Sequence, residues 1–251
     1  MGRFIKVEPR VAGSATQPAG SPDSMLVAMQ IGMLLFPKLT QLDLTGPHEV
    51  LARLPGATTH LVGKTRDPVT SETGLTILPT VSFAEAPALD LLFVPGGFGQ
   101  IAATDDAATL AWIAAAGASA AWVTSACTGS LLLGAAGLLR GYRAATHWAF
   151  MELLPLVGAI PVAERVVVDR NRITGGGVTA GIDLALTIVA AVSGREVAEQ
   201  IQLQLEYAPA PPFASGHPSV AAPALVTRAR AQIAGRYAER EAQLRRITGS
   251  G

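Results

Sequence analysis

The chain has 251 residues with 19 basic and 19 acidic side chains, so its formal net charge is zero. Proteins that bind nucleic acid or an anionic membrane surface need a surplus of lysine and arginine, so this balance argues against both kinds of partner. Hydrophobic residues make up 49% of the chain and charged residues 15%, which predicts a large buried core. A single cysteine, Cys127, excludes an internal disulfide, and no Cys and His cluster indicates a metal site.

Two segments raise the question of targeting or membrane insertion. Residues 1–28 are rich in Gly, Ser, Pro and Ala and lack the apolar core of a secretory signal, so we expect a flexible N-terminal extension. Residues 107–139 carry no charge over a length that could span a bilayer. Glycines and a polar cluster at 124–130 instead favour two short elements that meet at a turn. We therefore expect a cytoplasmic protein.

Strands and helices alternate along residues 29–207. The first strand is a continuous apolar run at 29–36, which indicates burial on both faces of a sheet. Further strands are predicted at 60–64, 89–94 and 121–125, with an edge strand or hairpin at 75–83 and a small hairpin at 164–174. A helix is predicted within the segment 41–54, and further helices are predicted at 105–116, 129–139, 179–192 and 195–206. In the first of them, we expect Thr45 to cap the helix and Pro47 to lie in its first turn.

This order predicts an α/β fold, a flavodoxin-like three-layer sandwich whose mostly parallel sheet carries helices on both faces. Residues 29–207 are expected to form one domain. Residues 208–251 are expected to form a Pro-rich segment and a helical tail, whose Arg-rich amphipathic helix at 223–247 packs against a neighbour. Ligands in such folds bind beyond the carboxyl ends of the strands.

Cys127 lies between a predicted buried strand and a predicted helix. A tight turn there would display its side chain above free backbone N–H groups at the positive end of the helix dipole. Small residues flank it in the string Ser-Ala-Cys-Thr-Gly at 125–129, as the turn of a nucleophile elbow requires. Buried cysteines are commonly inert, but this placement favours a nucleophile whose thiol pKa is lowered.

Developing negative charge at such a nucleophile needs hydrogen-bond donors. A Pro-Gly-Gly turn at 95–97 follows a strand expected beside the one that ends at Cys127. The N–H groups of Gly97 and Thr128 are therefore predicted to form an oxyanion-type donor pair. A Pro-Gly-Gly turn alone is only a turn, so this prediction depends on the two strands being neighbours.

Asp43 is the candidate acid or base. It lies between two leucines just after the first strand, where it is either a helix cap or a carboxylate in an apolar pocket. Desolvation in such a pocket would raise its pKa and let it act as acid and as base near neutral pH. His147 is a weaker partner for the cysteine, and the glycine run at 175–177 lacks the pattern of a phosphate-binding loop.

Five strings together are similar to the ThiJ/PfpI superfamily, whose fold resembles that of class I glutamine amidotransferases. They are LDLTGP at 42–47, FVPGG at 93–97, TSACTGSLLLGAAGLL at 124–139, RAATHW at 143–148 and TGGGVTAGID at 174–183. Within the superfamily, the chain most resembles the isonitrile hydratases, from about residue 30 to residue 213.

The resemblance implies that Cys127 is the nucleophile, that Asp43 contacts it and handles the proton, and that Thr128 and Gly97 line the oxyanion side. It implies hydration of an isonitrile to an N-substituted formamide through a thioimidate on Cys127, with no cofactor and usually in a homodimer. Leu42, Leu44, Phe98 and Trp148 are expected to supply apolar walls for the substrate. Many superfamily proteases carry a His where this chain has Thr128, which argues against peptidase activity.

Two other functions remain open at this point. Related domains are fused to helix-turn-helix regulators, although the single helix after residue 212 is too short for such a unit and the neutral charge argues against DNA. The third possibility is a glyoxalase, deglycase or redox-responsive protein in which Cys127 attacks an aldehyde or is oxidised.

Overall fold

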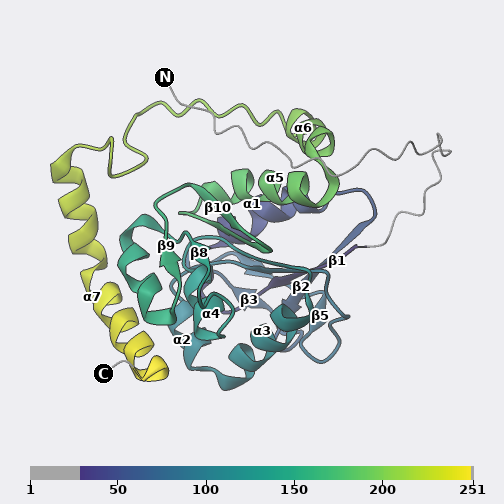
Figure 1. Ribbon diagram of the computed structural model, residues 1–251, viewed down its shortest axis with the longest axis horizontal. Coiled ribbons are helices and arrows are strands. Elements are labelled where there is room, and N and C mark those ends of the chain that lie inside the picture. Colours follow the sequence, from purple (N-terminus) through teal and green to yellow (C-terminus); the bar gives the residue numbers. More distant parts are fainter. Residues whose placement is uncertain (1–28, 250–251) are drawn as a thin grey trace.

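The computed structural model describes residues 29–249 and builds them around one sheet of seven strands (Figure 1). The predicted extension at 1–28 lies outside the described residues. The strand order is β10-β11-β7-β6-β1-β2-β5, and all neighbours are parallel except β10 and β11. These strands are β1 (Met29–Leu34), β2 (Ala57–Gly63), β5 (Val81–Ser82), β6 (Leu91–Val94), β7 (Trp122–Ser125), β10 (Val166–Asp169) and β11 (Arg172–Gly175).

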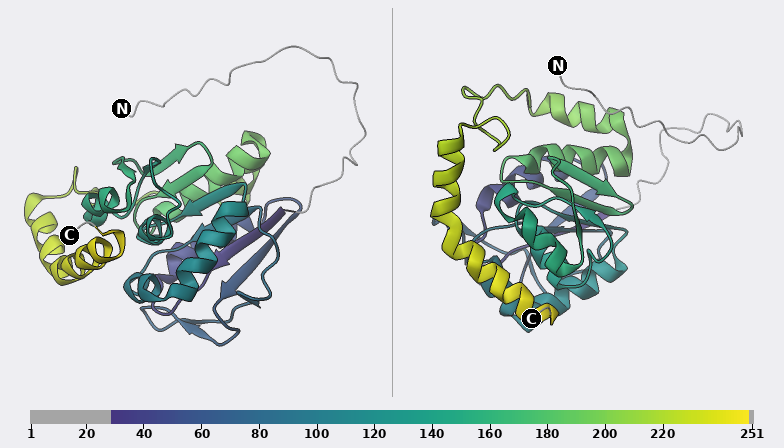
Figure 2. Two further views of the ribbon diagram at one scale, coloured as in Figure 1. Left: turned by 60° about the horizontal axis from the view of Figure 1, so that its bottom comes forward. Right: turned by 60° about the vertical axis from the view of Figure 1, so that its left-hand side comes forward.

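Helices cover both faces of the sheet, so the predicted three-layer α/β sandwich is confirmed (Figures 1 and 2). One layer contains α1 (Gln41–Leu51) and α5 (Ala180–Ser193), with α6 (Arg195–Gln204) packed on α5. The opposite layer contains α2 (Gln100–Asp105), α3 (Ala107–Ser119) and α4 (Gly129–Ala135). A 3-10 helix, η1 (Trp148–Val157), and two small sheets complete this part: β3 (Val69–Thr70) with β4 (Thr76–Ile77), and β8 (Arg143–Ala144) with β9 (Ile160–Pro161).

The apolar runs in the sequence correspond to the centre of the sheet. All four residues of β6 are fully buried, as are Ile31, Met33 and Leu34 of β1, because helices lie over both faces. Each such large side chain stabilises the fold by roughly 1.5–3 kcal/mol relative to exposure. The uncharged stretch at 107–139 divides into α3, β7 and α4. Among the described residues, no helix is both long and apolar enough to cross a membrane.

Two predictions about the first helices are wrong. Helix α1 begins at Gln41, so Thr45 is not its cap and Pro47 lies well inside it. The Thr45 hydroxyl instead donates to the side chain of Gln41, one turn earlier. The predicted helix at 105–116 corresponds to α3, and the short helix α2, which was not predicted, precedes it, separated by the extended backbone of Asp106.

Helix α7 (Pro223–Thr248) runs along one side of the sandwich and ends near α2 (Figures 1 and 2). The neighbour it packs against is this chain itself: η1, α2 and α4. Leu244, Gln243 and Arg240 are buried in that contact, with Arg240 only 1% exposed. The last helix therefore adds a buried positive charge to the domain.

Candidate active site

The carboxyl ends of β6 and β7 lie side by side, as the sequence predicted. Their register pairs Val94 with Ser125, so the turn at 95–97 and the residue Cys127 leave the sheet at the same level. Helix α1, which follows the neighbouring strand β1, brings Asp43 to this place. The structure thus brings together all four predicted site residues.

Cys127 has the strained backbone of a nucleophile elbow. Its φ is 53°, a value that non-glycine residues seldom adopt. Its N–H donates to the Gly176 carbonyl at 2.8 Å, and its carbonyl accepts the Thr146 hydroxyl at 2.9 Å. A Cβ on Gly129 would lie 2.1 Å from the Val94 carbonyl oxygen, so the turn closes only with a glycine there.

Asp43 is a fully buried carboxylate in the first turn of α1. Its Oδ2 accepts the Gly96 N–H at 3.1 Å, whereas its Oδ1 is buried and accepts no N–H or O–H donor. A Cβ on Gly96 would lie 2.5 Å from the Thr128 nitrogen and 2.9 Å from Oδ2 of Asp43. Glycine at position 96 therefore allows the carboxylate and the elbow to meet.

Burial sets the proton affinities of this pair. Desolvation raises the pKa of Asp43 to about 7, against the lowering effect of hydrogen bonds from the Cys127 thiol and the Gly96 N–H. Desolvation also raises the pKa of Cys127 well above its usual value, and the nearby Asp43 charge adds to the rise. The predicted lowering of the thiol pKa is wrong, because the Thr128 N–H opposes these two effects without outweighing them.

A thiol and a carboxylate arranged in this way can exchange one proton at neutral pH. Above pH 7 Asp43 is mostly ionised while Cys127 keeps its proton. The carboxylate can then remove the thiol proton as the sulphur attacks and return that proton to the product of the attack. This is acid–base chemistry by a Cys-Asp pair.

The predicted oxyanion donors are only partly available. The Gly97 N–H donates to the Thr128 hydroxyl at 3.0 Å, so it is already occupied. The Thr128 N–H faces the Cys127 sulphur, where it favours the thiolate. Thr128 thus joins the Gly97 turn to the elbow through its side chain.

His147 does not bond to Cys127 among the contacts of residues 29–249. Its Nδ1 accepts the Ala149 N–H at 3.3 Å and caps η1. Burial, assisted by the positive charge of Arg240, lowers the pKa of His147 to about 4, so the ring is neutral at pH 7. Within the same described residues, no cluster of three or more His, Cys, Asp or Glu side chains could hold a metal ion.

A cavity of about 620 Å³ flanks the elbow. Thr146 and Gly176, which both bond to the Cys127 backbone, line it together with Trp148, Met151 and Val178. Of the four residues expected to supply apolar walls, only Trp148 lines this cavity. Leu44 is buried in the core, while Leu42 and Phe98 line two other cavities.

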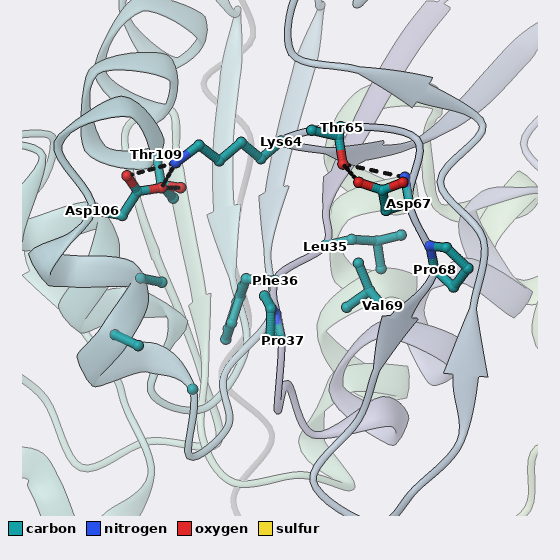
Figure 3. A pocket seen from close by; sticks show the side chains of 13 residues that line it. Leu35, Phe36, Pro37, Lys64, Thr65, Asp67, Pro68, Val69, Asp106 and Thr109 are labelled. Atoms are coloured by element: carbon teal, nitrogen blue, oxygen red, sulfur yellow. Dashed lines mark hydrogen bonds and ion pairs between the residues drawn. The ribbon is translucent and has the colours of Figure 1, made fainter.

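Another cavity, of about 390 Å³, lies at the ends of β1 and β2 (Figure 3). Phe36 and Val69 form part of its wall, and Lys64 pairs with Asp106 across it. Unlike the first cavity, it is lined by none of the residues that hydrogen-bond to the backbone of Cys127. It therefore does not belong to the candidate active site.

Arg240 is the site residue that sequence reasoning missed. Its guanidinium donates to the Gly97 carbonyl at 3.0 Å and to Oε1 of Gln100 at 2.7 Å. The residue is 143 positions from Gly97, on a helix whose composition resembles that of a solvated amphipathic surface. Nothing in its local pattern distinguishes it from the exposed arginines of the same helix.

Comparison with known proteins agrees with the fold. Residues 29–191 match the model of the family described as DJ-1/PfpI. The chain belongs to the DJ-1/PfpI family. It is 57% identical to the isonitrile hydratase of Pseudomonas putida, over 83% of this chain and 91% of that enzyme. The crystal structure of a ThiJ/PfpI family protein from Pseudomonas syringae superposes with a TM-score of 0.85 at 46% identity, covering 91% of this chain and 97% of that one.

The chain is also similar to a transcriptional regulator. The chain is 31% identical to the HTH-type transcriptional regulator GbdR of Pseudomonas aeruginosa, over 76% of this chain. The match covers 54% of that regulator, so this chain spans about half of its length. The chain is therefore similar both to an enzyme and to a regulator, so its function has to be argued from the site.

Proposed function

We propose that the protein is an isonitrile hydratase, a lyase that adds water to R–NC and releases an N-substituted formamide. The observation that carries the proposal is the 57% identity to an enzyme of that name over most of both chains. The buried Cys127 and Asp43 pair supports it, because the addition needs a nucleophile and a group that both accepts and donates a proton.

In the first step, the Cys127 sulphur attacks the terminal carbon of the isonitrile. The Asp43 carboxylate takes the thiol proton and delivers it to that same carbon, which gives the thioimidate R–N=CH–S–Cys127. The Thr128 N–H stabilises the sulphur as it becomes anionic. One proton moves from sulphur to carbon, and no oxidant or reductant takes part.

In the second step, water adds to the thioimidate carbon while Asp43 takes one of its protons and passes that proton to the nitrogen. This gives the tetrahedral adduct R–NH–CH(OH)–S–Cys127. The adduct then collapses: the carbon–sulphur bond breaks, Asp43 carries the hydroxyl proton to the leaving sulphur, and R–NH–CHO is released. One carboxylate with a pKa of about 7 is suited to both directions of transfer.

The cavity beside the elbow is the proposed place of the R group. Its apolar members Trp148, Met151 and Val178 would contact a hydrophobic substituent, while Glu164, Arg165 and Arg230 also line it. Its volume of about 620 Å³ accommodates an aryl or cyclohexyl ring. The reacting carbon would reach Cys127 past Thr146 and Gly176.

The test is incubation of the purified protein with cyclohexyl isonitrile, with N-cyclohexylformamide followed by NMR. We expect formamide to accumulate over many turnovers. Absence of turnover with both cyclohexyl and aryl isonitriles contradicts the proposal. A parallel incubation with methylglyoxal separates the glyoxalase or redox alternative, which predicts loss of the aldehyde and no formamide.

A regulatory or sensor domain is the second candidate, and the similarity to GbdR favours it. Against it stand the zero net charge and the packing of α7, a single helix, on its own domain. A gel shift at low salt distinguishes the two: tight DNA binding without isonitrile turnover would select the regulator.

Several accompanying properties belong to the same proposal. We infer a homodimer that needs no cofactor, binds no nucleic acid and acts in the cytoplasm. The dimer and the absence of a cofactor come from the family resemblance, and the lack of nucleic-acid binding comes from the balanced charge. Sedimentation velocity tests the dimer, and turnover by dialysed, metal-free protein tests the cofactor.

A further inference from the structure

Arg240 is a buried cation without an ion pair. Its side chain is 1% exposed, and among the described residues no carboxylate lies within 4.0 Å of its guanidinium. Its Nη1 is also buried and has no hydrogen-bond partner. An unpaired buried charge costs several kcal/mol of desolvation, so its retention calls for a compensating role.

The contacts of Arg240 lead directly to the active site. Its Nη2 donates to the carbonyl of Gly97, and the N–H of that same residue donates to the Thr128 hydroxyl. Gly96, the preceding residue, donates to Asp43. The Arg240 guanidinium therefore anchors the turn at Gly96 and Gly97. This turn holds Asp43 and Thr128, the two residues that interact with the Cys127 thiol.

The guanidinium itself is held firmly. Its Nε donates to Gln100 Oε1, and the amide of that buried side chain is fixed in turn by a 2.7 Å bond to the Thr104 hydroxyl. Its carbon lies 4.4 Å from the centre of the Phe150 ring, so the cation stacks on an aromatic face. The planar guanidinium donates to two fixed acceptors at once, which the single ammonium group of a lysine cannot reproduce.

We propose that Arg240 is a positioning residue of the active site: it holds the Gly96 and Gly97 turn against Asp43 and Thr128, and its unpaired positive charge stabilises negative charge on Cys127. The last helix thereby completes a site whose other residues come from the sheet ends. The positioning role in turnover rests on the proposed hydratase function, whereas the effect on the thiol does not.

The charges around the thiol make its reactivity a sensitive readout. Asp43 raises the pKa of Cys127, while Arg240 lowers it. Arg240 in turn interacts with Arg236 and Glu239 of its own helix and with Glu72, and His147 beside the site is neutral at pH 7. Removing Arg240 takes away the one cation that favours the thiolate in this set.

The experiment measures alkylation of Cys127 by iodoacetamide between pH 7 and 10 in the full chain. Cys127 is the only cysteine, so no other thiol contributes. For Arg240→Met, we expect the alkylation profile to move to higher pH and the rate at a fixed pH below the thiol pKa to fall about tenfold. Isonitrile turnover by this variant should fall about tenfold or more.

Gln243→Ala is the matched control. Gln243 is buried on the same helix and donates to the Ile101 carbonyl, so its loss weakens helix docking without removing charge. We expect its alkylation profile to match that of the wild type. The proposal is overturned if Arg240→Met keeps the wild-type profile, or if Gln243→Ala shifts the profile equally.

If Arg240→Met does not fold, Arg240→Lys is the variant that tests the positioning role of Arg240. This variant keeps the positive charge but loses the planar guanidinium. We therefore expect an alkylation profile close to that of the wild type, with isonitrile turnover about tenfold below that of Gln243→Ala. Turnover equal to that of Gln243→Ala would refute the positioning role. Should the wild type fail to hydrate isonitriles, the hydratase proposal fails, while a shifted alkylation profile in Arg240→Met still supports the charge effect.

Discussion

At the scale of single residues, the site depends on burying an acid and a thiol together. Desolvation raises the proton affinity of both groups, and the Asp43 charge raises that of Cys127 further, whereas the hydrogen bond from the thiol lowers that of Asp43. Burial of Asp43 therefore lowers the stability of the fold. It also produces a carboxyl group whose pKa of about 7 allows proton transfer in both directions at neutral pH.

We expect Asp43→Asn to lower turnover about 100-fold or more, because an amide can neither take the thiol proton nor return it. In the wild type, kcat/KM should fall as the pH drops below about 7, since Asp43 must be ionised to accept that proton. The control is Asp106→Asn, which removes a carboxylate from the other cavity and should leave turnover unchanged. Turnover by Asp43→Asn within a few-fold of wild type would remove Asp43 from the mechanism.

The same substitution should gain stability relative to the wild type as the pH rises from 4 to 7. Folded Asp43 holds its proton up to pH 7, whereas the unfolded chain loses it near 3.8, so the wild-type free energy of unfolding falls as the pH rises between these values. The slope is at most about 1.4 kcal/mol per pH unit. Urea unfolding at pH 4, 5, 6 and 7 should show Asp43→Asn gaining on the wild type with each step. A difference that is constant across these pH values speaks against a raised pKa.

At the scale of elements, two turns at the ends of β6 and β7 bring the reacting groups together. Their geometry depends on small residues, and the strings around 96 and 129 carried that information in the sequence. For this reason the elbow and its neighbouring turn could be predicted: the signals are local, and parallel strands end at one edge of a sheet.

Gly96→Ala should disturb the site more than the fold. Its Cβ would lie 2.5 Å from the Thr128 nitrogen and 2.9 Å from Asp43 Oδ2, so the turn must move away from both. We expect turnover to fall about tenfold or more and the protein to lose stability in urea. Gly235→Ala is the control, because its Cβ meets open space on α7 and alanine favours a helix by about 1 kcal/mol. Wild-type turnover in Gly96→Ala would show that the close approach at this turn is unnecessary.

Other features could not be inferred from local pattern. Pro47 suggested the first turn of a helix, yet α1 begins six residues earlier because Gln41 follows directly on the turn after β1. The helix dipole suggested a reactive, low-pKa thiol, but burial of Cys127 is a property of the whole layer structure and outweighs the dipole. Arg240 acts across 143 positions, and such contacts leave no periodic signal.

At the scale of the whole molecule, α7 packs the last part of the described chain along one side of the sandwich (Figure 2). Its buried residues face η1, α2 and α4, and its other side stays polar and exposed. A helix that would be a solvated tail by composition thus becomes a wall of the site.

Leu244→Ala tests the docking of this helix. Leu244 is fully buried, so its truncation should lower the free energy of unfolding by about 2–5 kcal/mol if α7 unfolds with the rest of the domain. Ile247→Ala, on the same helix but 38% exposed, should cost less than about 1 kcal/mol. Equal and small effects for both variants in urea unfolding would mean that α7 is not part of the cooperative fold.

The most direct measurement of the central claim compares Cys127→Ala with the wild type in cyclohexyl isonitrile hydration. Without the sulphur no thioimidate forms, and only uncatalysed addition of water remains. We expect turnover to fall at least about 1,000-fold in a variant that stays folded by circular dichroism. Turnover by Cys127→Ala within tenfold of the wild type would contradict a cysteine nucleophile at this site.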